Sequence, residues 1–115
     1  MTVLKWLVSL LIVITGGIHF YLAALFGGGF YTWAFVVAGL GFLLGLVLIL
    51  YNYKPIFTYS LGIVFTLGQI VWYWIVDGIT LSMISSLPLT HLVDKGAQVL
   101  LVILLTYLLV IELKK

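Results

Sequence analysis

Cysteine and arginine are absent from this chain of 115 residues, and only eight residues carry a formal charge, five lysines and three acids. The lack of cysteine excludes a disulfide framework, a thiolate metal site and a cysteine nucleophile. Charged residues make up 7% of the chain, whereas soluble domains carry about 25%. So few charges cannot cover a soluble globule, which excludes a soluble enzyme, a disordered chain and a nucleic-acid binder.

Hydrophobic residues make up 65% of the sequence and gather in four long runs. A helix needs about 20 mostly apolar residues to cross a membrane core of about 30 Å. Barrel strands are about half as long and alternate strictly between polar and apolar residues, which these runs do not. We therefore predict an all-α membrane protein, a single domain over residues 1–115, with transmembrane helices at about 3–26, 32–51, 57–76 and 91–113.

The connections between these spans differ in length and composition. Three glycines at 27–29 and the stretch 52–56, which contains Pro55, are short turns, so consecutive spans are expected to form an antiparallel four-helix bundle. Residues 77–90 mix apolar side chains with Ser and Thr, as is typical of a segment lying in the membrane interface. Thr90 is the expected N-cap of the fourth span.

The lysines are divided unequally between the two sides of such a bundle. One side carries Lys5, Lys54, Lys114 and Lys115, and the other carries Lys95 together with Asp77 and Asp94. Because cytoplasmic loops are enriched in positive charge, we predict a multi-pass protein of the cell membrane with both termini in the cytoplasm.

Small residues share one face of the second span, at Ala34, Ala38, Gly41 and Gly45. Such residues let helix backbones approach closely in lipid, where the hydrophobic effect does not drive association. The face is expected to pack within the bundle, and the alternative is an interface with another subunit.

Three polar side chains are predicted to lie in one layer of the outer leaflet. At 1.5 Å per residue, His19 lies about 7 Å outward of the midpoint of its span, Gln69 about 4 Å and Gln98 about 6 Å. Asp94, one turn before Gln98, is the expected charge partner near the outer boundary. The layer either stabilises packing through interhelical hydrogen bonds, binds a ligand, ion or cofactor, or contacts a partner subunit.

Known reaction chemistries find little support in these residues. A haem held by His19 and His91 would have to bridge a difference in depth of about 9 Å. A metal at His19 would find only amides in its layer, and no carboxylate is expected at the depth that proton-coupled transport needs. We predict no catalytic residues and no metal ligands, and no cofactor is required.

Four short stretches also resemble a family of uncharacterised archaeal four-span membrane proteins that is well represented in halophiles. They are Ile14–Ala23 (ITGGIHFYLA), Ala38–Leu46 (AGLGFLLGL), Gly62–Trp72 (GIVFTLGQIVW) and Val93–Leu101 (VDKGAQVLL). The family's elements G-x-x-H, F-T-x-x-Q and D-K-x-x-Q map onto His19, Thr66, Gln69, Asp94, Lys95 and Gln98. The resemblance implies a fold and a source, and it brings no activity with it.

Our leading expectation is a small non-catalytic subunit that packs against larger integral-membrane proteins, for instance in an archaeal respiratory or oxidase-type complex. The small extramembrane regions, the small-residue face and the lack of a catalytic constellation favour it. The alternative is a binder of haem, quinone or lipid that uses His19, Gln69, Asp94 and Gln98, and a homo-oligomeric transporter or channel comes third. The expected partners are membrane lipid and larger membrane subunits, without nucleic acid.

Overall fold

A computed structural model describes residues 2–76 and 88–115 of the chain. The helices are α1 (Thr2–Phe26), α2 (Phe30–Leu50), α3 (Pro55–Val71), the short π-helical turn η1 (Trp72–Val76) and α4 (Leu89–Leu113). The described residues contain four helices long and apolar enough to cross a membrane, with η1 extending the third, and no strand. The predicted interfacial segment lies outside the described residues, except for its last three positions.

Proline sets the start of two helices. Pro55 is the first residue of α3, two positions before the predicted boundary, because its fixed φ suits the first helical turn. The prediction that Thr90 caps the fourth span is wrong. Pro88 is the N-cap, and its carbonyl oxygen accepts hydrogen bonds from the backbone N–H groups of His91 and Leu92. The helix therefore begins directly after the proline.

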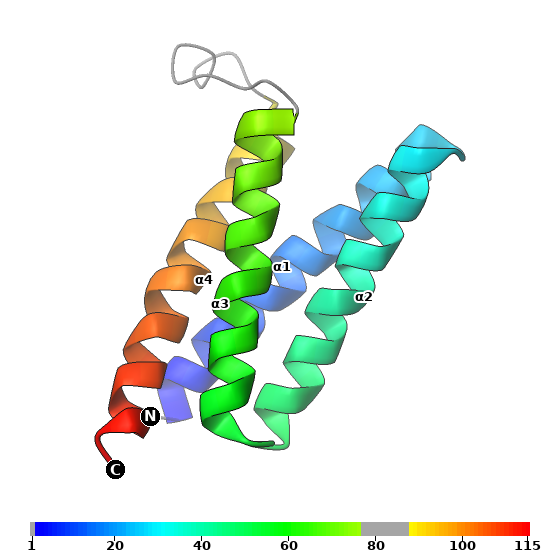
Figure 1. Ribbon diagram of the computed structural model, residues 1–115. Helices are drawn as coiled ribbons and strands as arrows, with labels where there is room; N and C mark the ends of the chain where they lie inside the picture. The colour runs from blue at the N-terminus through cyan, green and yellow to red at the C-terminus, as the bar shows by residue number, and fades with distance from the viewer. Residues whose placement is uncertain (1, 77–87) are drawn as a thin grey trace.

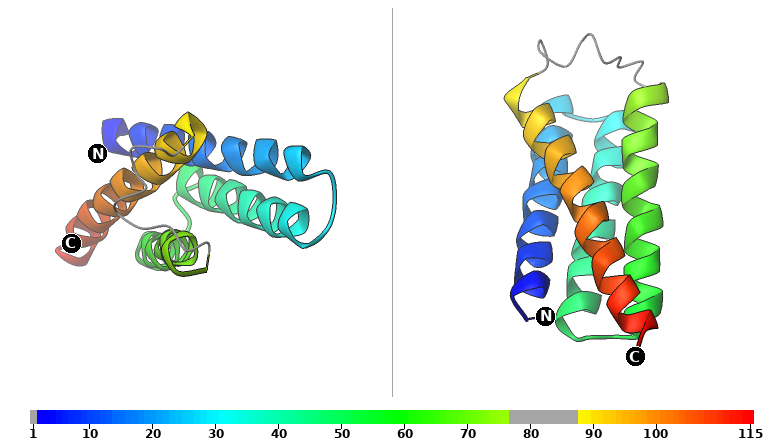
Figure 2. Two further views of the ribbon diagram at one scale, coloured as in Figure 1. Left: turned by 90° about the horizontal axis from the view of Figure 1, so that it is seen from above. Right: turned by 90° about the vertical axis from the view of Figure 1, so that its left-hand side faces the viewer.

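Figures 1 and 2 show how the helices are arranged, with both ends of the chain at the same end of the molecule. Helix α1 packs along α2, α3 packs along α4, and α1 also contacts α4, whereas α2 and α3 contact each other much less than these three pairs do. The short turn at residues 51–54 joins α2 and α3 at the end that holds the termini, and the two helices separate toward the other end (Figure 1).

Glycines determine how closely α1 and α2 approach. A Cβ atom on Gly39 would lie 2.9 Å from the ring of Phe20, and one on Gly16 would lie 3.4 Å from Cβ of Phe42. The turn between the two helices is also made of glycine, because Gly27–Gly29 all have positive φ angles of 67°, 133° and 86°. Such angles are strained for residues that carry a Cβ.

The predicted small-residue face of α2 is divided between several environments. Ala38 is buried and Ala34 is half-buried. Gly41 lies beneath Phe65 of α3, since a Cβ there would be 2.5 Å from the end of that ring, whereas Gly45 faces open space. The contact with α1 uses Gly39, one position away from the expected face.

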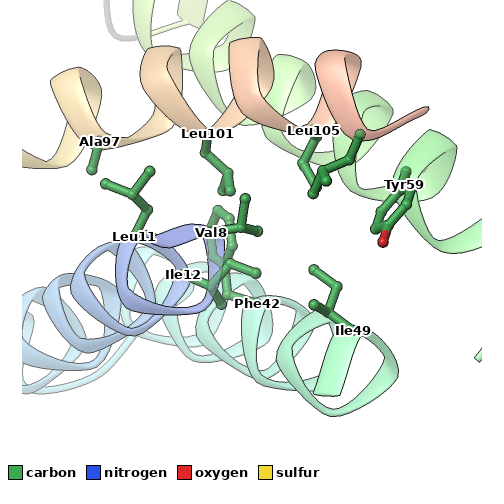
Figure 3. Packing of buried hydrophobic residues seen from close by; sticks show 10 residues of the cluster. Val8, Leu11, Ile12, Phe42, Ile49, Tyr59, Ala97, Leu101 and Leu105 are labelled. Atoms are coloured by element: carbon green, nitrogen blue, oxygen red, sulfur yellow. The ribbon is translucent and has the colours of Figure 1, made fainter. Parts of the chain in front are cut away.

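The apolar core lies toward the end that holds the termini. Figure 3 shows side chains from all four long helices meeting there, and the cluster comprises Val8, Leu11, Ile12, Phe42, Ile49, Tyr59, Ala97, Leu101, Leu105 and Leu108. Many other large apolar side chains point outward, among them Val64, which is 68% exposed. An apolar exterior and a long axis of 43 Å match a bilayer about 40–45 Å thick including its headgroups.

Replacing Gly39 by leucine is expected to destabilise the fold by about 1–3 kcal/mol, because the new side chain overpacks the α1–α2 contact at Phe20. Gly45→Leu is the matched control on the same helix, since Gly45 faces open space. Unfolding in mixed micelles, followed by circular dichroism, measures the difference. Equal losses from the two variants would contradict this account of the contact.

Candidate functional site

Four polar side chains from α1 and α4 form a closed network, here called the polar ring. The Thr15 hydroxyl donates to Oδ1 of Asp94 and accepts a hydrogen bond of 3.1 Å from Nε2 of Gln98. Lys95 closes the ring, because its Nζ donates to Oε1 of Gln98 at 3.1 Å and lies 3.4 Å from Oδ2 of Asp94. Thr15, Asp94 and Gln98 are each at most 3% exposed. The ring therefore joins two helices inside the molecule.

The polar ring offsets the free-energy cost of burying the ion pair between Asp94 and Lys95. Removing a carboxylate and an ammonium group from water is costly unless they also find hydrogen bonds. Asp94 receives one from Thr15 and faces Lys95, so its charge is balanced within the site. Hydrogen bonds between membrane helices contribute about 0.6–2 kcal/mol each, and the two from Thr15 to α4 fix how that helix sits against α1.

His19, one helical turn after Thr15, extends the network and is 2% exposed. Its Nδ1 lies 2.7 Å from the Thr15 carbonyl oxygen and 3.8 Å from Oδ1 of Asp94. A carbonyl oxygen can only accept, so Nδ1 carries the proton. In the neutral imidazole Nε2 is then a hydrogen-bond acceptor. The rings of Phe35 and Phe42 pack against the imidazole at centroid distances of 5.7 and 5.3 Å.

The Nε2 atom of His19 has no hydrogen-bond partner in the described part of the chain. Every fully enclosed side-chain nitrogen or oxygen of those residues has one, so Nε2 must reach open space. His19 lines a cavity formed by residues of all four long helices. The imidazole therefore presents a free acceptor to that cavity.

Tyr73 joins the end of α3 to the same site. It lies in η1, and π-helical turns are frequent at functional sites. Its hydroxyl is 3.0 Å from Nδ1 of His91, and Nζ of Lys95 lies 4.6 Å from the centre of its ring. Tyr73 thus contacts the polar ring from the side opposite Thr15.

The cavity has a volume of about 490 Å³ and lies mainly between α2 and α3, toward the end away from the termini. Its lining is largely aromatic and includes Phe30, Tyr31, Trp33, Phe35, Phe65 and Trp72. Its polar lining consists of His19, Gln69, Tyr73, His91, Asp94 and Lys95. Ligand sites have this character, with a volume of about 300–1,000 Å³, an apolar wall and a few convergent polar groups.

The structure joins two of the three residues that the sequence placed in one layer, because His19 and Gln98 both bond to Thr15, and Gln98 does not line the cavity. His19, Asp94 and Gln98 belong to the connected network, and Gln69 lines the cavity with its amide free of hydrogen bonds to any described residue. Thr66 lies instead on a second, apolar groove of about 230 Å³ between α2 and α3. Asp77, which the sequence assigns to the same side of the bundle as Lys95 and Asp94, lies outside the described residues.

The expectation that only amides surround His19 is wrong. Asp94 is buried beside it, because the α1–α4 contact carries the first turns of α4 into the interior, which distance along the sequence does not reveal. Thr15 and Lys95 were missing from the predicted ligand-binding set. The spacing of Thr15 and His19, four residues apart on one helix face, was the available signal. Within the described residues, no three His, Cys, Asp or Glu side chains gather as a metal site would require.

Replacing Thr15 by valine is expected to lower the free energy of unfolding by about 1–3 kcal/mol, since it leaves buried polar atoms of Asp94 and Gln98 without their partner. Thr106→Val is the matched control, because Thr106 is exposed and bonds only to the Val102 carbonyl of its own helix. Chemical unfolding in micelles compares the two variants. If both lose the same small amount, the polar ring is not a stabilising contact.

Comparisons with known proteins give no match to this chain, whether against family models, curated proteins or solved structures. The resemblance to archaeal four-span proteins therefore stays a prediction. The candidate function must be argued from the polar ring, the free acceptor of His19 and the aromatic cavity.

Proposed function

We propose that this protein binds an uncharged, lipid-soluble molecule within the membrane, as an antiparallel four-helix bundle with both termini in the cytoplasm. The observation that carries the proposal is the aromatic cavity of about 490 Å³, into which the buried His19 presents a polar atom that has no partner among residues 2–76 and 88–115. Packing alone does not require such an atom, because burying an unsatisfied polar group costs free energy.

The ligand should be uncharged because the site already balances its own charges. Asp94 and Lys95 form an ion pair, and His19 is neutral when its Nδ1 donates to the Thr15 carbonyl oxygen and its Nε2 stays free. An additional charge in the cavity would be dehydrated without a partner of opposite sign. A neutral head avoids that cost.

The ligand should also be amphiphilic. Aromatic side chains from α2, α3 and η1 offer flat apolar surface around the polar atoms. The apolar groove of about 230 Å³ begins beyond Phe65, which lines both spaces. A polar head beside His19 with an alkyl tail directed along the groove would fit this arrangement. Access from the lipid is supported by the exposure of two lining side chains, Phe30 at 67% and Trp33 at 68%.

The arrangement supports binding without catalysis. His19 and Gln69 would hold and orient the head, and the polar ring would fix the imidazole through Thr15. The Tyr73 hydroxyl lies 3.0 Å from Nδ1 of His91 in the same lining, but the proposal requires no reaction of either group. That the protein is not itself an enzyme stays a prediction.

An accessory-subunit role, the leading expectation from the sequence, becomes the second candidate. Gly45 faces open space beside the apolar groove, so part of the small-residue face is uncovered in the single chain. Gly41 is not available to contact another subunit, because Phe65 of the same chain covers it. Membership of an archaeal respiratory or oxidase-type complex stays a prediction, as does a transporter or channel role.

Filling the cavity should abolish ligand binding without unfolding the protein. A side chain at Gly68 would enter the cavity and meets no atom within 4 Å, whereas Gly17, also helical and open, lies outside it. We expect native mass spectrometry of gently purified protein to find one bound small molecule in the wild type and in Gly17→Leu. Gly68→Leu should lose it, and His19→Ala should retain it less than a tenth as often, by loss of a buried hydrogen bond.

Retention of the molecule by Gly68→Leu would contradict the proposed site. The same spectra decide between the two candidate functions. Larger subunits in fixed stoichiometry, with no bound small molecule, would favour the accessory role.

The predicted orientation can be tested by cysteine labelling, since the chain has no cysteine of its own. Tyr51→Cys and Leu89→Cys place single thiols at exposed positions toward opposite ends of the bundle. A membrane-impermeant maleimide should label Leu89→Cys in intact cells and Tyr51→Cys only after permeabilisation, because lysine-rich ends stay inside. The reverse pattern would refute the orientation.

A further inference from the structure

We propose that the head of the ligand is an aromatic hydroxyl, the chemistry of a lipid-soluble phenol or quinol, and that His19 makes the site prefer it to the corresponding carbonyl compound. The inference rests on the proposed function and specifies its ligand class. It follows from the direction in which the hydrogen bonds around His19 run.

The hydrogen bond to Thr15 leaves His19 with an acceptor facing the cavity. Nδ1 lies 2.7 Å from a carbonyl oxygen and must be the donor. Protonating Nε2 as well would create an imidazolium beside an Asp94 carboxylate whose charge Lys95 already balances at 3.4 Å. That extra charge would be buried among the rings of Phe35 and Phe42, where it is costly. A neutral imidazole that donates from Nδ1 to the Thr15 carbonyl oxygen accepts at Nε2, so it pairs with a ligand that donates a hydrogen bond.

Other polar groups of the cavity do not offer this discrimination. Gln69 carries both a donor and an acceptor in one amide, so it suits a hydroxyl and a carbonyl equally. Lys95 already contacts Gln98, Asp94 and the ring of Tyr73, and the Tyr73 hydroxyl lies beside His91. The two carboxylate oxygens of Asp94 face Thr15 and Lys95, and Nδ1 of His91 lies beside the Tyr73 hydroxyl. The selective contact is thus the one with Nε2 of His19.

The wall of the cavity indicates why the donor should sit on an aromatic ring. Side chains of Phe30, Tyr31, Trp33 and Phe35 from α2 face the cavity together with Trp72 of η1. Flat rings stack or meet edge to face against such side chains. A hydroxyl on a ring places a strong donor in the plane of the head, while both ring faces remain apolar. A saturated alcohol would donate a hydrogen bond to His19, but it has no flat ring to stack against the aromatic wall.

The test compares a hydroquinone carrying a ten-carbon tail with its own quinone under anaerobic conditions. The two probes share shape and tail, but only the hydroquinone donates hydrogen bonds. Binding to the purified, delipidated protein in detergent is measured by equilibrium dialysis, with Gly68→Leu subtracting partition into the micelle. We expect the wild type to bind the hydroquinone at least about tenfold more tightly, since the quinone leaves Nε2 unpaired and sets two acceptors against each other.

His19→Phe keeps a ring of similar size and removes the acceptor. It should bring the two affinities within about threefold, and circular dichroism should show unchanged helix content. Gln69→Leu is the matched control in the same cavity and should retain the preference for the hydroquinone. If His19→Phe fails to fold, the comparison of the two probes on the wild type still decides the inference.

Equal binding of both probes, or tighter binding of the quinone, would overturn the inference and leave the proposed cavity standing. So would binding of neither probe by a protein that still retains its native small molecule. If neither probe binds and no native molecule is found, both the inference and the proposed function fall. A preference for the hydroquinone that survives His19→Phe would remove His19 from the explanation.

Discussion

The structure depends on satisfying polar groups where no water is available to do so. In a hydrocarbon environment every buried donor and acceptor must find a partner inside the protein. Thr15 of α1 meets this requirement together with Asp94, Lys95 and Gln98 of α4. The ring fixes the depth at which α1 and α4 cross, because sliding either helix by one turn would separate the Thr15 hydroxyl from the carboxylate. The positions of the other two helices are defined relative to this pair.

Each remaining helix packs against one member of that pair. Helix α2 lies along α1 through close contacts at Gly16 and Gly39, and α3 lies along α4, where a Cβ atom on Gly62 would lie 3.0 Å from Leu105. Helices α2 and α3 are then left as the least closely packed neighbours, and the space between them is lined largely by aromatic and apolar side chains. The cavity is therefore a consequence of the packing that closes the polar ring, and the ring supplies one side of its wall.

His19 connects the stabilising role of the ring with a binding role. Its Nδ1 belongs to the network, and its Nε2 faces the cavity. A group that served packing alone would not need a free acceptor at a position 2% exposed. The same imidazole is thus oriented by Thr15, surrounded by Phe35 and Phe42, and available to a ligand, which is why the proposed chemistry depends on this residue above the others.

Four helices long and apolar enough to cross a membrane were predictable from the sequence, because this property depends on local composition. The length and apolarity of each run have only to match the thickness of a bilayer. The layer containing His19, Gln69 and Gln98 followed from counting residues along those helices. The environment of Asp94 and the roles of Thr15 and Lys95 could not be predicted in this way. The use of Gly39 in place of Gly45 as a close contact could not be predicted either. Pairing of Thr15 with Asp94, and the freedom of Nε2 on His19, depend on how α1 and α4 are rotated and crossed. That geometry results from packing among all four helices, and no local pattern contains it.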